Sequence, residues 1–288
     1  MAVPQPVYVL AADHRWQIEE WCDAHAADRS RIPELKAIVV EGFRLARDRS
    51  PAAARHGALL LDEQYSSPLI AAAQRDGILV ATPAERAGVF PLEWTSEPFH
   101  AALTGDMVKV IVRHRPEYSE ERIAAERGKL RTLGDWCRVN ARPFLLEVVV
   151  MRAHEDERTF ETAGRPAILA DYIRASYDAG IVPDFWKMEG TTDAVAAAVV
   201  DEAIAEREGP RFLVLGKGAG FGLVEQWFAA ARRMRTAGGF AIGRTVYWEP
   251  CVKWMDGRLD RKGAVAQVAA NYERLIAAWE ALAGSRPS

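Results

Sequence analysis

The sequence predicts a (β/α)8 barrel, a TIM barrel, made by one domain that spans residues 1–288. Three observations support this fold class: eight short apolar runs recur along the chain, helix-like segments alternate with them, and no linker or change of composition divides them. Near-continuous apolar runs are typical of parallel strands that are covered on both faces. An open dinucleotide-binding sheet is the alternative, but it requires a Gly-rich turn after the first strand, where this chain has AADHRWQ.

The predicted strands are short and rich in leucine and β-branched residues. They cover residues 7–14, 57–64, 77–83, 107–114, 144–150, 184–190, 212–218 and 241–248. The third of them has the weakest strand signal. The predicted helices combine apolar residues at helical spacing with charged outer faces. They cover residues 33–49, 119–140, 167–180, 191–208, 224–238 and 263–284, and the segment 16–56 is long enough for two helices.

Composition places the chain among soluble proteins of the cytoplasm. Of its 288 residues, 49% are hydrophobic and 27% are charged, and the net charge is -3. This balance provides no basic surface for nucleic acid or for an anionic membrane. The three cysteines are scattered and match neither a disulfide framework nor a zinc site. No apolar run approaches the ~18 residues of a membrane span, and the first residues lack the pattern of a signal peptide.

Polar residues at the carboxyl ends of the strands are the candidates for a functional site, because the catalytic residues of (β/α)8 barrels lie there. They are Asp13, His14, Arg15, Asp62, Glu63, Lys109, Arg113, Glu147, Lys187, Glu189, Lys217 and Arg244. The first three of these admit two interpretations, a salt bridge at the strand end or contacts with substrate. Asp62 and Glu63, with Asp106, hint at a metal, but the paired His and carboxylate spacing of a metal site is missing from the sequence. We therefore expect no metal and no cofactor. Four tryptophans are expected in packing: Trp16, Trp21, Trp248 and Trp254.

The stretch PDFWKMEG, residues 183–190, places two charged residues on a strand that is otherwise apolar. Side chains alternate between the two faces of a strand, so Phe185, Lys187 and Glu189 point to the same face. Burial lowers the pKa of a lysine from ~10.4 and makes its amine nucleophilic, as Schiff-base chemistry requires. The alternatives are an ammonium group that reaches the barrel mouth, or a structural ion pair with Glu189 or Glu147. Charged residues that face inward on several strands favour the catalytic interpretation.

Two Gly-rich stretches at the last two strand ends predict a phosphate site. They are LGKGAG at 215–220 and IGRT at 242–245. Barrels often bind phosphate with the loops after these two strands, where glycines let backbone N–H groups approach an anion and basic side chains add charge. The predicted site comprises Gly216, Lys217, Gly218, Gly243 and Arg244. The alternative is an ordinary Gly-rich turn.

Seven motifs in this order resemble those of a known superfamily: LAADHRWQ, LLLDEQY, VKVIV, LLEVVV, WKMEG, LVLGKGAG and AIGRTVYWEP. Over nearly the whole chain they resemble the class I, Schiff-base aldolases of the tagatose-bisphosphate aldolase type. They are most similar to the aldolase-like domain (DUF2090) that follows the sugar kinase in bifunctional myo-inositol catabolism proteins. The sugar aldolases have a Ser-Ala-Gly type of sequence at the seventh strand, whereas GKG stands here and follows the inositol-type branch. The kinase half is missing from this sequence, so we expect a stand-alone unit.

The resemblance implies a role for each matching residue. Lys187 would form the Schiff base, Glu147 would transfer protons, and Lys109 would line the site. The phosphate would contact Gly216, Lys217, Gly218, Gly243 and Arg244, and the remaining site residues would be Asp13, His14, Arg15, Arg113 and Glu189.

The resemblance also implies a reaction. It is the cleavage of 5-dehydro-2-deoxygluconate 6-phosphate to glycerone phosphate and malonate semialdehyde in inositol catabolism, a carbon–carbon lyase activity. Arg15 or Arg113 would then bind the substrate carboxylate. The alternatives are an aldolase for another ketose phosphate, such as tagatose, fructose or a sulfo-sugar derivative, and a non-catalytic sugar-phosphate binding protein. The expected partner is a phosphorylated small molecule, with neither nucleic acid nor membrane, and outer helices such as QWFAAARRM could form a homo-oligomer interface.

Overall fold

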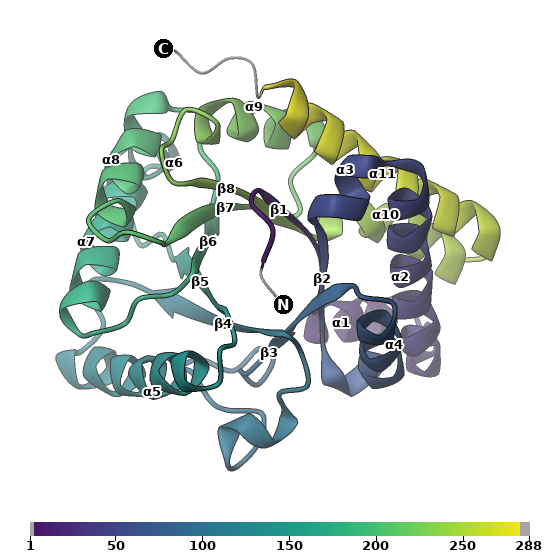
Figure 1. Cartoon of the computed structure of the whole chain (residues 1–288), viewed down its shortest axis with the longest axis horizontal. Helices are drawn as coiled ribbons and strands as arrows, with labels where there is room; N and C mark the ends of the chain where they lie inside the picture. The colour runs from purple at the N-terminus through teal and green to yellow at the C-terminus, as the bar shows by residue number, and fades with distance from the viewer. Residues whose placement is uncertain (1–2, 283–288) are drawn as a thin grey trace.

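The computed structural model describes residues 3–282, which form a closed barrel of eight parallel strands in the order β1 to β8. Figure 1 shows the strands as a ring with the helices outside it. The strands are β1 Val7–Ala12, β2 Gly57–Leu61, β3 Leu79–Pro83, β4 Met107–His114, β5 Phe144–Val150, β6 Phe185–Glu189, β7 Arg211–Leu215 and β8 Ala237–Ile242. The predicted fold class is therefore confirmed, including the weakest predicted strand.

Helices connect the strands and cover the outside of the barrel (Figure 1). The α-helices are α1 Trp16–Ala24, α2 Ile32–Arg49, α3 Pro51–His56, α4 Glu63–Arg75, α5 Glu120–Val139, α6 Glu157–Thr159, α7 Arg165–Asp178, α8 Ala194–Ile204, α9 Phe221–Ala231, α10 Arg244–Met255 and α11 Arg261–Ala281. Three short elements complete the set: the 3-10 helices η1 Arg29–Arg31 and η2 Phe99–Ala102, and the π-helix η3 Phe160–Gly164. Residues 283–284, the end of the last predicted helix, lie outside the described residues.

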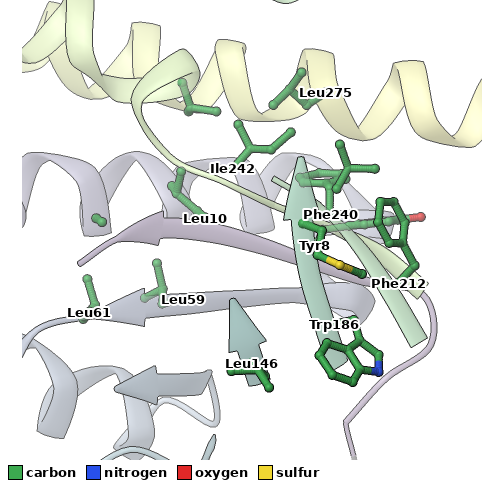
Figure 2. Packing of buried hydrophobic residues seen from close by; sticks show 14 of the residues in the cluster. Tyr8, Leu10, Leu59, Leu61, Leu146, Trp186, Phe212, Phe240, Ile242 and Leu275 are labelled. Carbon is green, nitrogen blue, oxygen red and sulfur yellow. The ribbon is translucent and has the colours of Figure 1, made fainter. Parts of the chain in front are cut away.

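The alternation of side chains along the strands divides the core into two parts. Inward-facing residues such as Val9 and Phe185 fill the barrel, while Trp186 and Met188 belong to the larger cluster between the strands and the helices. Figure 2 shows outward-facing strand residues, among them Ile242, beneath Leu275 of α11. Full burial of each large apolar side chain contributes about 1.5–3 kcal/mol. This outer layer holds the strands so that their inward-facing polar residues converge at one end.

Several strands begin or end a few residues from their predicted bounds; β7, for example, ends at Leu215, so Lys217 follows it, and the last strand differs most. We expected the last strand at 241–248 with Arg244 on it, but β8 ends at Ile242 and Arg244 is the first residue of α10. The run TVYW has high strand propensity, whereas the true strand begins AGG, which has little. Pairing of β8 with both β7 and β1 outweighs these local preferences.

Within residues 3–282, none of the helices is long and apolar enough to cross a membrane.

Candidate active site

Two adjoining cavities lie at the carboxyl ends of the strands. The main cavity has a volume of about 520 Å³ and extends to the loops after β7 and β8. The side chamber has a volume of about 90 Å³ and lies between the loop after β1 and the segment after β3. His14, Glu147 and Lys187 line both. Every residue to which the aldolase resemblance assigns a role lines one cavity or both, whereas the candidates Asp62 and Glu63 line neither. The lining residues are Asp13, His14, Arg15, Lys109, Arg113, Glu147, Lys187, Glu189, Gly216, Lys217, Gly218, Gly243 and Arg244.

Two buried lysines share one carboxylate where the cavities meet. Lys187 on β6 donates to Glu147 Oε2 over 2.8 Å, and the backbone register places these two residues directly opposite each other. The Nζ of Lys109 on β4 lies 3.1 Å from the same oxygen and 2.9 Å from Asp13 Oδ2. The exposed fraction of these side chains is 3% for Lys187, 4% for Lys109 and 7% for Glu147. The structural ion pair that was an alternative for Lys187 is therefore present, and it involves Glu147.

Glu85 completes this cluster and was missed by the sequence analysis. It follows β3, is buried, and accepts a hydrogen bond from Lys109 at 2.8 Å through Oε1. Arg15 donates to the backbone carbonyl of Glu85 at 3.2 Å, and its guanidinium lies 3.8 Å from Glu85 Oε1. Only the position after the third strand could have indicated it, because the motifs considered there end at Pro83.

The ion pairs separate the two lysines chemically. Burial alone would lower the pKa of Lys109, but the carboxylates of Asp13, Glu147 and Glu85 raise it well above its ordinary value. Burial likewise would raise the pKa of Asp13 and Glu147, but the neighbouring ammonium groups of Lys109 and Lys187 hold both pKa values below their usual range. Lys109 therefore remains an ammonium group. Within residues 3–282, Lys187 contacts the single carboxylate of Glu147, so it is the better candidate for a nucleophile.

His14 is a neutral group in the wall of both cavities. Burial, with the nearby charges of Arg244 and Lys187, lowers the pKa of His14 to about 3. The Oη of Tyr247 lies 2.9 Å from His14 Nδ1, and burial raises the pKa of this tyrosine well above its usual range. The tautomer of His14 sets the direction of this hydrogen bond: the tyrosine O–H donates to Nδ1 when the ring proton is on Nε2.

Lys36 on α2 anchors the backbone around Asp13. Its Nζ donates to the carbonyl oxygens of Ala12 and His14, the latter at 2.7 Å, and to Asp62 Oδ2 at 2.7 Å. Lys36 and Asp62 are completely buried. Asp62 also caps α4 by accepting from the backbone N–H of Tyr65. From the sequence, Asp62 was a weak candidate for a metal ligand, whereas the structure shows it in this ion pair.

The other two acidic candidates are also separated from the cluster. Asp106 precedes β4 and accepts from the backbone N–H of Val80 at 3.0 Å, which places it at the amino end of the strands. Burial raises the pKa of Glu63 to about 7, and its side chain faces the backbone N–H of Thr104 at 3.5 Å. In the part of the chain that the structure describes, no group of three His, Cys, Asp or Glu side chains could hold a metal ion.

The predicted phosphate loops meet at one end of the main cavity. Arg244 donates to the backbone carbonyl of Lys217 at 3.2 Å, and Gly218 adopts a φ of +79° that glycine tolerates best. Gly220 and Gly243 cap α9 and α10 without a side chain, so the N-terminal N–H groups of both helices lack a side-chain acceptor there. Helix N-termini and two basic residues favour an anion.

Gly243 also has a packing role that its sequence context does not reveal. A Cβ at this position would lie 1.9 Å from the carbonyl oxygen of Ala11 and 2.9 Å from the ring of His14. Only glycine therefore allows the end of β8 to approach the end of β1.

Glu189 interacts with Lys217 in the loop after β7 and does not contact Lys187. Its Oε2 accepts from Lys217 at 3.0 Å and from the buried Arg165 of α7. Arg165 also donates to the backbone carbonyl of Gly190 at 3.0 Å, and it was missed by sequence analysis because it lies on a helix. These contacts connect the loop after β7 to the end of β6.

Arg113 is the cation at the other end of the site. It lines both cavities, and its guanidinium lies 4.2 Å from the ring centre of Phe90. Trp16, which we expected in packing, also lines both cavities.

The fold and the site together define a (β/α)8 barrel with a charged cluster at the carboxyl ends of its strands. The chain belongs to the family described as "Uncharacterized protein conserved in bacteria (DUF2090)", whose model matches residues 2–283. No curated protein matches it. Among solved structures, a fructose-bisphosphate aldolase from Plasmodium falciparum, in complex with TRAP and a small molecule inhibitor, matches with a TM-score of 0.69. The identity is 11%, and the match covers 99% of this chain and 93% of that one, so the likeness shows a shared fold.

Proposed function

We propose that this protein is a class I aldolase that forms a Schiff base through Lys187. The observation that carries the proposal is the pair of Lys187 and Glu147, 2.8 Å apart and buried, where the two cavities meet. A lysine nucleophile needs a nearby base and a water-poor surrounding. Lys187 has both, and the predicted phosphate loops line the same cavity. The aldolase-like fold of the structural relative supports the same class.

The cluster can supply each proton transfer of the reaction. Lys187 gives a proton to Glu147 and attacks the substrate ketone; Glu147 returns that proton to the carbinolamine hydroxyl, which leaves as water. The resulting iminium carbon withdraws electrons while Glu147 takes the proton of the β-hydroxyl group. The carbon–carbon bond then breaks to give an aldehyde and an enamine. Glu147 protonates the enamine carbon, and water hydrolyses the iminium to release the ketone.

The two ends of the site are suited to a substrate with phosphate at one end. Lys217, Arg244 and the N-termini of α9 and α10 would bind the phosphate. Arg113 is at the other end, where Arg15 is already engaged with Glu85. Such a site fits 5-dehydro-2-deoxygluconate 6-phosphate, with the carboxylate toward Arg113. Glycerone phosphate and malonate semialdehyde would be the products, in inositol catabolism.

The test is incubation with glycerone phosphate followed by borohydride, with the modified peptide identified by mass spectrometry. We expect a reduced adduct on Lys187 that is lost in Lys187→Met and retained in Lys253→Met, a matched control on α10 outside both cavities. A turnover screen with the keto acid phosphate and with ketose phosphates then identifies the substrate. Folded protein that binds glycerone phosphate but gives no adduct would contradict the proposal and favour a non-catalytic sugar-phosphate binder.

A further inference from the structure

The side chamber is bounded by the loop after β1 and the segment after β3, next to Lys187 and Glu147. Its volume of about 90 Å³ is much smaller than the 520 Å³ of the main cavity. It is still several times the ~10–15 Å³ that one water molecule requires on the same measure. The chamber therefore has room for a short polar fragment beside the reacting lysine.

Three residues that line the chamber carry buried polar atoms without a hydrogen-bond partner among residues 3–282. These atoms are Arg15 Nε, Gln17 Oε1 and Glu85 Oε2. The exposed fraction is only 6% for Arg15 and 3% for Glu85. A buried polar atom without a partner is unfavourable, so a ligand that supplies the missing hydrogen bonds is favoured. Two acceptors and one donor match hydroxyl groups, each of which can donate and accept.

The charges on the wall determine how much negative charge the fragment can carry. Four cations line the chamber, namely Arg15, Lys109, Arg113 and Lys187, against three carboxylates, namely Asp13, Glu85 and Glu147. Burial raises the pKa of Glu85, while the charges of Lys109 and Arg15 favour its ionised form. With Glu85 ionised, four minus three leaves one positive charge, because His14 is neutral. One carboxylate balances this charge. A phosphate carries about two negative charges, one more than the chamber balances.

We propose that the side chamber binds the half of the substrate that leaves as the aldehyde, and that this half is short, polar and free of phosphate. Glu85 is its specificity-determining residue, because it lines the chamber and its Oε1 is held by Lys109, while its Oε2 has no hydrogen-bond partner among residues 3–282. Arg113 binds the carboxylate of the aldehyde when the aldehyde has one. The proposal rests on the proposed aldolase function and adds to it that bisphosphorylated ketoses are excluded as substrates.

The experiment is condensation of glycerone phosphate with three aldehydes, followed by mass spectrometry of the products. The aldehydes are malonate semialdehyde, D-glyceraldehyde and D-glyceraldehyde 3-phosphate. For the wild-type protein we expect kcat/KM for the better unphosphorylated aldehyde to exceed that for the phosphorylated one at least tenfold, which corresponds to about 1.4 kcal/mol. In Glu85→Gln the chamber gains a positive charge and loses an acceptor, so this preference should fall about tenfold or more. Arg86→Gln, a change at the exposed neighbour of Glu85 that pairs with Glu93, should keep the wild-type preference.

The borohydride adduct with glycerone phosphate is measured on each variant and shows whether it is folded and reactive. If the adduct forms and the phosphorylated aldehyde reacts as well as the others, the assignment of the chamber is wrong and the aldolase function stands. An unchanged preference in Glu85→Gln would likewise overturn the role of Glu85. If wild-type protein forms no adduct on Lys187, both proposals fail.

Discussion

Replacing Lys36 should reveal how strongly the fold supports the end of β1. Lys36 is completely buried, and its ammonium group contacts Asp62 and the two carbonyl groups that flank Asp13. Methionine has a similar length but no charge, so Lys36→Met leaves Asp62 as an unpaired buried carboxylate. Breaking a buried ion pair from one side costs about 3–5 kcal/mol. Such a loss is a large share of the roughly 5–15 kcal/mol by which a folded domain is stable.

The double variant Lys36→Met/Asp62→Asn separates the charge from the other contacts. Asparagine can still accept from the backbone N–H of Tyr65 and cap α4, but it carries no charge. We therefore expect the double variant to recover about half of the lost free energy of unfolding or more. The assay is urea unfolding, followed by the fluorescence of the buried Trp186 and Trp279. A single variant that loses less than about 1 kcal/mol, or a double variant no more stable than the single one, would refute this reasoning.

Three further predictions concern the site and its surroundings. Glu147→Gln should lower the cleavage rate about 10²- to 10⁴-fold, because the proton acceptor of Lys187 is lost, and a rate within tenfold of wild type would contradict its role. The pKa of Glu63 is raised from 4.5 to about 7 in the folded protein, so its ionisation destabilises the fold as the pH rises through this range. Glu63→Gln should therefore raise Tm relative to wild type at pH 8, and much less at pH 4.5. An equal difference in Tm at both pH values would count against burial as the cause of the raised pKa. Gly243→Ala should lower Tm and weaken glycerone phosphate binding in calorimetry, because the added Cβ meets the carbonyl of Ala11, whereas Gly222→Ala, where a Cβ meets nothing within 4 Å, should leave binding unchanged.

Much of the site could be found from the sequence because strand periodicity is a local property. Lys109, Glu147 and Lys187 lie on strands whose alternation places them inside the barrel, and the predicted strand ends bring them together. Glu85 could not be found in this way. It lies in an irregular segment after β3, and only the backbone path of that segment brings it to Lys109.

Several contacts depend on residues that are far apart in the chain and carry no local signal. Arg165 on α7 holds Glu189, which pairs with Lys217 in the loop after β7 and not with Lys187, although Lys187 and Glu189 lie two residues apart on β6. Arg244 was placed on a strand because TVYW has strand propensity, and the pairing of the shorter β8 on both sides decides otherwise.

The sequence by itself determined the barrel, the order of its elements and the inward-facing residues of the strands, because these follow from periodicity and burial of apolar side chains. Only the tertiary structure decided which charges pair. Within the described residues, Lys109 has three carboxylate partners and Lys187 has one. This difference depends on distances between different strands and loops. It separates Lys109, an ammonium group, from Lys187, the candidate nucleophile. The side chamber likewise exists only where the loops after β1 and β3 meet.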